Sequence, residues 1–256
     1  MTVTLIPVDR QARIQKLIKE KGILKVTELS RMFGVTELTI RRDFDVLEKK
    51  NVLDRTHGGA VLRRRVKQEV LYAEKNLKYN DQKEKIGVAA GKIVESGDTL
   101  LINTGSTNTQ VLRHLPDKSL CVITSNANAL VEIEHPEIKV ILTGGQFRRE
   151  SNSLIGDFVH TLLKNVCGSK TIIGVDGVSV GFGLTALLQE EAAVARLMID
   201  QTLGPVIVVA DSSKMGVVSN FVTAPLDKVD IIITDDKIKP GFRRELGERG
   251  IEVVIA

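Results

Sequence analysis

Aromatic residues are scarce in this chain: they make up 4% of its 256 residues, and tryptophan is absent. Aliphatic side chains must therefore build the core, and a hydrophobic content of 43% is enough to do so. Cysteine is also rare. Cys121 and Cys167 stand in unrelated surroundings without a histidine cluster, so the sequence predicts reduced thiols in the cytoplasm, no metal site and no cofactor.

Long apolar runs are missing as well. The apolar patch over residues 3–8 is too short for a signal peptide and lacks a basic start and a small-residue cleavage site. No run approaches the roughly 20 residues that a helix needs to cross a bilayer. We also find no basic amphipathic helix that would bind a membrane surface, so no membrane partner is expected.

Charge is distributed unevenly along the chain. The net charge is +4, but residues 1–75 hold 17 Lys and Arg against 10 Asp and Glu, a balance of +7. Residues 76–256 hold 19 against 22, a balance of −3. A basic first part on a mildly acidic body is typical of a protein whose first part meets nucleic-acid phosphates.

The basic part begins with a helical pattern over residues 10–21, and a shorter one follows. Leu29, Met32 and Phe33 are spaced i, i+3, i+4, as on the apolar face of an amphipathic helix. Gly34 can adopt the positive φ that ends such a helix. The pattern therefore predicts a short helix followed by a tight turn.

A further helix is expected after Thr36, which is a good N-cap residue. Its apolar side chains share one face: Ile40, Phe44 and Leu47. The residues expected to meet bases and phosphates lie at the helix start and on the other face: Thr36, Thr39, Arg41 and Arg42. Two short helices, a tight turn and a basic leading edge indicate a helix-turn-helix DNA-binding unit. On spacing alone, an ordinary helical hairpin with solvated arginines is the alternative.

Two β-prone runs around a Gly-Gly pair follow, over residues 52–56 and 60–62. They predict a small hairpin, which would make this unit a winged helix. The wing residues expected to contact DNA are Arg55, His57 and Gly58. We place the winged helix-turn-helix domain at residues 9–62.

Residues 63–80 are rich in charge and include the triplet Arg63, Arg64 and Arg65. They act either as a solvated linker or as an additional clamp on the DNA backbone. We place the linker between the two domains here.

The segments Thr39–Phe44 and Arg55–Ala60 resemble the signature of the DeoR family of bacterial regulators of sugar metabolism. That family usually has Leu where Phe44 stands and Ser where Thr36 stands. The resemblance implies a DNA-binding transcription regulator, and it favours repression that an effector relieves.

Residues 81–256 alternate between apolar runs of strand length and helix-like stretches. The expected strands are 99–102, 120–124, 139–142, 171–175, 206–210, 231–234 and 253–255. The expected helices are near 83–95, 107–115, 126–134, 154–165, 189–203 and 241–249. Strands that are apolar throughout and alternate with helices predict an α/β domain with a mostly parallel sheet.

Ligands of open α/β sheets bind beyond the carboxyl ends of the strands. After the first expected strand, Gly105, Ser106 and Thr107 open onto a helix and combine a flexible backbone with hydroxyls and free N–H groups, a natural anion cradle. Other strand ends supply Asp176 and Lys214. Together they suggest a site for a phosphorylated sugar or polyol.

This layout is similar to the sensor domain of the same DeoR family, which resembles ribose-5-phosphate isomerases and coenzyme A transferases in fold. Family members often carry Asp where Asn103 stands and Asn where Ser125 stands. The resemblance implies an effector-sensing domain at residues 81–256. The residues implied in effector binding are Lys85, Gly105, Ser106, Thr107, Thr124, Asp176, Glu191 and Lys214.

A sugar-phosphate isomerase with an accessory head is the competing interpretation, with Asp176, Glu191 and Lys214 as general acid–base groups. A basic winged-helix head has no evident use in an isomerase, so we predict a regulator and not an enzyme. Its partners would be double-stranded operator DNA and a phosphorylated sugar or polyol. A homodimer or homotetramer is expected, because one winged helix reads only a few base pairs.

Overall fold

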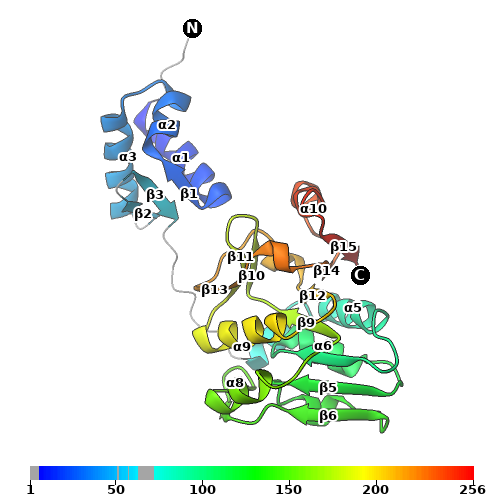
Figure 1. The fold of residues 1–256 in the computed structure, drawn as a ribbon. Coiled ribbons are helices and arrows are strands. Elements are labelled where there is room, and N and C mark those ends of the chain that lie inside the picture. The colour runs from blue at the N-terminus through cyan, green and yellow to red at the C-terminus, as the bar shows by residue number, and fades with distance from the viewer. Residues whose placement is uncertain (1–5, 51, 57, 63–71) are drawn as a thin grey trace. The chain divides into compact units, whose positions relative to one another are not determined.

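The computed structural model describes residues 6–50, 52–56, 58–62 and 72–256. The chain divides into two compact units, residues 1–67 and 68–256, which we call the head and the sensor unit. Figure 1 follows both units from the blue helices near the N-terminus to the red helix α10. Within the described residues, no helix is both long and apolar enough to span a membrane.

The head consists of three helices and a small antiparallel sheet. Its elements are α1 (Pro7–Lys21), β1 (Ile23–Lys25), α2 (Val26–Phe33), α3 (Glu37–Lys49), β2 (Leu53–Thr56) and β3 (Gly59–Leu62). The strands pair in the order β1-β3-β2, so β2 and β3 form the predicted wing and β1 is an unpredicted third strand.

Local sequence signals explain the turn between α2 and α3. Gly34 lies in the left-handed region, at φ 63° and ψ 33°, and ends α2 as predicted. The Thr36 side chain accepts a hydrogen bond from the Thr39 amide at 3.2 Å, which caps α3. Met32 was expected on the apolar face of α2, but its side chain is 54% exposed, because Leu29 and the half-buried Phe33 already fill that face.

The sensor unit is built on a seven-stranded parallel sheet in the order β15-β14-β12-β9-β4-β5-β6. Its strands are β4 (Thr99–Ile102), β5 (Leu120–Thr124), β6 (Ile138–Leu142), β9 (Lys170–Gly174), β12 (Val206–Val209), β14 (Ile231–Thr234) and β15 (Glu252–Ile255). These are the seven predicted strands, with ends that shift by one residue or none. The α/β class with a mostly parallel sheet is confirmed.

Helices bury both faces of this sheet, which explains why its strands are apolar throughout. One face packs with α5 (Asn80–Gly91), α6 (Ser106–Arg113) and α7 (Ala129–Glu132). The other packs with α8 (Asp157–Leu163), α9 (Gln189–Asp200) and α10 (Pro240–Gly247). Alternate strand residues serve the two cores: Leu100 and Ile102 face the first, and Leu101 faces the second.

Several short elements of the sensor unit differ from the prediction. Helix α4 (Tyr72–Leu77) lies within the expected linker. Two small antiparallel sheets were not predicted: one pairs β7 (Gln146–Arg148) with β8 (Ser153–Ile155), and the other orders β10 (Gly177–Ser179), β11 (Gly183–Ala186) and β13 (Phe221–Ala224). Strand β8 thus replaces the start of the helix expected over 154–165. Two 3-10 turns, η1 (Ser212–Lys214) and η2 (Leu226–Lys228), complete the unit.

Candidate functional site

The outward face of α3 is the candidate nucleic-acid surface of the head. Its buried face carries Ile40, Asp43, Phe44 and Leu47. The residues opposite this face at helical spacing are Leu38, Arg42, Asp45 and Lys49. Arg42 and Lys49 are exposed, which leaves their charges free to meet phosphates or base edges.

Arg41 lies to the side of this face. Its side chain is 43% exposed, and its Nη2 lies 3.8 Å from Oε2 of Glu37, one turn earlier. Thr36 and Thr39 pair their hydroxyls at 2.9 Å at the helix start. The structure therefore brings Thr36, Thr39, Arg41 and Arg42 to one end of α3, and Arg42 is the most outward of them.

The wing is tied to α3 by polar contacts. The Arg55 guanidinium pairs with Asp45, and the Arg55 amide donates to Oε1 of Glu48 at 2.9 Å. Arg55 and the turn residue Gly58 are both exposed, as a DNA contact requires. His57, the third wing residue expected to contact DNA, lies outside the described residues, as do Arg63, Arg64 and Arg65.

A buried ion pair positions α3 against α1. Arg10 Nε lies 2.5 Å from Asp43 Oδ2, its Nη2 lies 3.3 Å from Oδ1, and both side chains are almost fully buried. The Gln11 amide donates to the same carboxylate at 3.0 Å. Nothing in the sequence marks this pair, because each partner alone resembles an ordinary surface charge.

The sensor unit has a topological switch point between β4 and β9. From β4 the chain continues to one side as β5 and β6, whereas β9, β12, β14 and β15 extend to the other side. Such a point opens a crevice at the carboxyl ends of the two strands. Asn103 joins these ends, because its amide donates to the Gly174 carbonyl at 3.0 Å and accepts from the Gly174 N–H at 2.8 Å.

The predicted anion cradle lies at this switch point. Gly105 precedes α6 at φ 136°, a conformation that favours glycine. Ser106 and Thr107 form the first turn of α6, where backbone N–H groups have no helical acceptor. Their side chains are about nine-tenths buried, so an anion bound here would be largely shielded from water.

Asp176 follows β9 and is held by two donors. Lys75 Nζ lies 3.0 Å from its Oδ1, and the Leu187 amide donates to its Oδ2 at 2.9 Å. Burial acts to raise the pKa of Asp176, but Lys75, the Leu187 amide and Lys214 outweigh it and hold the pKa below its ordinary value. Asp176 is therefore a carboxylate ready to accept hydrogen bonds.

Lys214 acts on this carboxylate, and a further lysine, Lys83, lies near Lys75 and Lys214. Lys83 is buried on α5, and its ammonium donates to the Lys75 and Lys78 carbonyls. Burial lowers the pKa of Lys83 to about 8, with Lys75 and Lys214 acting in the same direction and Asp211 against them. Lys83 thus lies within electrostatic reach of both Lys75 and Lys214, and we call these three residues the lysine cluster.

Glu191, in the first turn of α9, lies within electrostatic reach of Asp176. Burial raises the pKa of Glu191, and Asp176 adds to that rise, whereas a hydrogen bond with Ser151 opposes it. Its Oε1 atom is buried without a partner among the described residues. This oxygen is free to pair with a ligand hydroxyl.

Two residues expected at this site have other environments. Lys85 is exposed on α5, and Lys83, two residues earlier, is the buried lysine. Thr124 is fully buried; its hydroxyl donates to the Ile102 carbonyl at 2.6 Å and accepts from the Asn126 amide at 3.0 Å. Thr124 thus joins β5 to β4, and its hydroxyl is fully buried.

Lys75, Lys83 and Tyr72 are the site residues that sequence analysis missed. Tyr72, on α4, donates its hydroxyl to Thr109 of α6 at 2.8 Å, and its amide donates to the Glu150 carbonyl at 2.7 Å. No motif marked α4, because it lies in the charged stretch expected to be a linker. The eight-residue spacing of Lys75 and Lys83 shows no pattern until α4 folds back onto α5.

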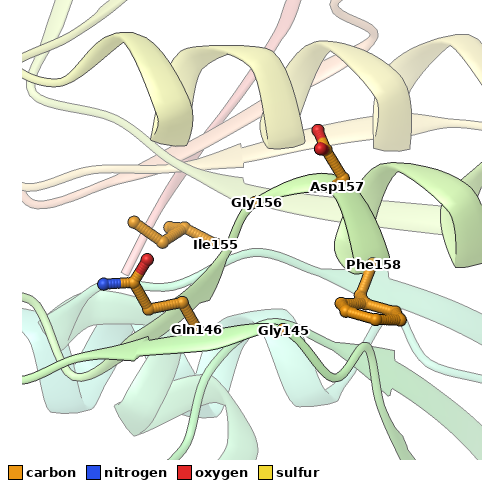
Figure 2. Close-up of a pocket in the computed structure, with 6 residues that line it drawn as sticks. All are labelled: Gly145, Gln146, Ile155, Gly156, Asp157 and Phe158. Atoms are coloured by element: carbon orange, nitrogen blue, oxygen red, sulfur yellow. The ribbon is translucent and has the colours of Figure 1, made fainter.

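A separate pocket of about 670 Å³ opens between β7 and the turn from β8 into α8. Figure 2 shows its six lining residues, with the Phe158 ring beside Gly145 and the Asp157 carboxylate pointing away from that ring. The lining residues are Gly145, Gln146, Ile155, Gly156, Asp157 and Phe158. They include one carboxylate and no cation, so this pocket does not suit a phosphate.

Comparison with known protein families matches both units. A DeoR-like helix-turn-helix domain matches residues 10–66, and a DeoR C terminal sensor domain matches residues 78–236. These matches cover the described α3, the wing and the lysine cluster except for Lys75.

Full-length relatives are also similar to this chain. The uncharacterized HTH-type transcriptional regulator YulB of Bacillus subtilis is 33% identical, over 96% of this chain and 95% of its own length. The HTH-type transcriptional regulator GlpR of Haloferax volcanii is 30% identical over 98% of both chains. The HTH-type transcriptional repressor GlcR of Bacillus subtilis is 30% identical over 96% and 95%.

Among solved structures, ribose 5-phosphate isomerase A from Methanocaldococcus jannaschii aligns with a TM-score of 0.39 and 18% identity, over 53% of this chain and 54% of its own. Both domain models and the full-length relatives agree with the helix-turn-helix head and the parallel sheet described above. The chain belongs to the DeoR family of helix-turn-helix transcription regulators.

Proposed function

We propose that the protein represses a carbohydrate-utilisation operon and that a phosphorylated sugar or polyol releases it from operator DNA. The observation that carries this proposal is that groups able to bind a phosphate and a carboxylate able to bind hydroxyls both follow the strands that flank the switch point. The cradle of Gly105, Ser106 and Thr107 offers backbone N–H groups to a phosphate, and the lysine cluster supplies positive charge. Asp176 offers acceptors to sugar hydroxyls.

The nature of the effector follows from the same groups. Three ammonium groups and a helix start attract a dianionic phosphate more strongly than a singly charged or neutral group. Inorganic phosphate would leave Asp176 and Glu191 without hydroxyl partners, which favours a phosphorylated polyol or sugar over the free ion. The similarity to GlcR, which is named as a transcriptional repressor, supports repression over activation.

A thermal-shift screen of phosphorylated sugars, each beside its unphosphorylated parent, tests the proposal. A true effector at about 100 times its dissociation constant stabilises the protein by roughly 2.7 kcal/mol. Lys214→Ala should lose this response and still bind operator DNA, giving a repressor that cannot be induced. Lys164→Ala, an exposed lysine on the other side of the sheet, is the matched control. Unchanged effector affinity in Lys214→Ala would place the ligand elsewhere.

A sugar-phosphate isomerase would use the same acidic and basic groups, so effector sensing and isomerisation need a direct comparison. Pentose and hexose phosphates that bind should remain unconverted after prolonged incubation with the protein. Conversion of any of them that Glu191→Gln abolishes would favour the enzyme.

We also propose that the active form is a homodimer or homotetramer that associates through the sensor unit. The head has a core of one small cluster and presents one α3, so two heads are needed to read a repeated operator. Light scattering of the full chain with and without operator DNA tests this. A monomer bound tightly to a single half-site would contradict it.

A further inference from the structure

The most outward residue in the first turn of α3 is apolar. Leu38 is 59% exposed, and helical spacing places it opposite the buried residues Ile40, Phe44 and Leu47. It lies one turn before the exposed Arg42, on the same stripe of the helix. A large aliphatic side chain at this position contributes nothing to the core of the head.

Water is a poor environment for this side chain, and duplex DNA offers a better one. The N-terminal residues of a recognition helix meet base edges in the major groove. In that groove the thymine C5-methyl group is the apolar feature, and aliphatic side chains distinguish thymine by contacting it. Leu38 can make no hydrogen bond to a base edge, so its selectivity can arise only from apolar contact.

The surroundings of Leu38 agree with a DNA partner. Thr36 and Thr39 place a pair of hydroxyls at the same helix start, and Arg42 and Lys49 continue the outward face with positive charge. Asp45, the one acid on this face, is paired with Arg55 of the wing. Charge on this face therefore complements a polyanion and opposes a second copy of the same basic surface.

We propose that Leu38 is a specificity-determining residue that reads a thymine methyl group in each operator half-site. The proposal predicts that one thymine at a fixed position in each half-site is preferred for its methyl group alone. The sequence pattern predicted DNA contacts only for polar and charged residues around the start of α3, so it gave no role to Leu38.

Replacement of thymine by deoxyuridine tests the proposal, since it removes the methyl group and keeps every hydrogen-bonding group. The probe is the tightest duplex selected by the full-length protein from a randomised duplex library, with each thymine replaced in turn. Burial of about one methyl group predicts that one replacement per half-site weakens binding about 3- to 5-fold.

Leu38→Ala should lose a similar factor on the thymine duplex and bind both duplexes equally. Val46→Ala on α3 and Met32→Ala on α2, which shorten exposed apolar residues outside the stripe of Leu38 and Arg42, should keep the full sensitivity to deoxyuridine. Circular dichroism checks that each variant folds, which the exposure of Leu38 leads us to expect. The proposal is overturned if no replacement weakens the parent, or if the same replacement weakens Leu38→Ala as strongly.

Discussion

Lys75 and Asp176 form an ion pair of 3.0 Å across 101 residues of sequence. Lys75 belongs to α4, the first described element after the head, and Asp176 lies two residues after the end of the central strand β9. A sugar hydroxyl that engages Asp176 must compete with this ammonium. Binding of an effector would therefore disturb the contacts of α4, the part of the sensor unit nearest to the head in sequence.

Replacement of Arg42 by Ala should weaken operator binding about 10-fold or more, because a good bidentate contact to guanine contributes roughly 1–3 kcal/mol of discrimination. If Arg42 contacts a phosphate instead, the loss of affinity will be the same for all DNA sequences. The slope of log affinity against log salt concentration will then become shallower by about 0.9. Gel shifts at several salt concentrations distinguish these cases. Arg243→Ala, an exposed arginine of α10, should bind as the parent does. Parental affinity in Arg42→Ala would show that α3 is not the recognition helix.

The pKa of Lys83, lowered to about 8, predicts a pH-dependent effector affinity. A bound phosphate stabilises the ammonium and raises its pKa, so binding near pH 8 takes up a proton. Affinity should fall as pH rises through about 8, since a phosphate ester with a second pKa near 6 stays dianionic there. Calorimetry in buffers of different ionisation enthalpy measures the proton uptake. Lys83→Met should abolish it and the exposed Lys85→Met should not, whereas equal uptake in both variants would contradict the assignment.

A second pH effect concerns stability and is placed at the opposite end of the sheet. Lys170 Nζ lies 2.7 Å from Asp98 Oδ2. Burial acts to raise the pKa of Asp98, but hydrogen bonds from Lys170, the Glu95 amide and Ser169 outweigh it and lower this pKa. A carboxylate whose pKa is lower in the folded state than in the unfolded state stabilises the protein at pH values above its unfolded-state pKa. That stabilisation is lost as the pH falls through the folded-state pKa.

Asp98→Asn should therefore cost about 3 kcal/mol of unfolding free energy at pH 7, because it leaves the buried Lys170 with only the exposed Glu95 as an ionic partner. The difference from the parent should shrink below about pH 4. Urea denaturation at several pH values measures it, with the exposed Asp227→Asn as control. A difference that stays constant down to low pH would rule out the ionic origin.

The wing offers a matched pair of glycines. A Cβ atom on Gly59 would meet the Leu24 carbonyl oxygen at 2.1 Å, whereas one on Gly58 meets nothing within 4 Å. Gly59→Ala should therefore destabilise the head by about 1–3 kcal/mol, and Gly58→Ala should not. Hydrogen exchange of the α1–α3 peptides in the full chain measures the difference. Equal protection in both variants would show that β1 and β3 can separate at little cost.

Local signals explain why the head was predictable. Gly34 and Thr36 fix the turn through their own conformation and side chain, and the apolar spacing of Ile40, Phe44 and Leu47 fixes which face of α3 is buried. The buried parallel strands were equally predictable from the sequence, because a run such as Leu100–Ile102 has no polar residue to face water.

The sensor site was less predictable, because its charges meet through tertiary structure. Lys75 reaches Asp176 only because α4 packs beside α6, where Tyr72 contacts Thr109. Lys83 and Lys85 lie on the same helix, and only the packing of α5 decides which of them is buried. The small sheets escaped prediction because strands such as Gly177–Ser179 and Gly183–Ala186 mix glycine and polar residues with apolar ones and contain no continuous apolar run.

The buried pair of Arg10 and Asp43 also decides how this DNA-reading unit can be transplanted. A fragment that begins at α2 would keep the whole helix-turn-helix but leave Asp43 as an uncompensated charge in its core. A chimeric regulator made by grafting this specificity onto another sensor must therefore carry α1 from Pro7 onward. The smallest portable module is the complete three-helix head, and exchange of α3 alone would require the recipient to supply its own arginine.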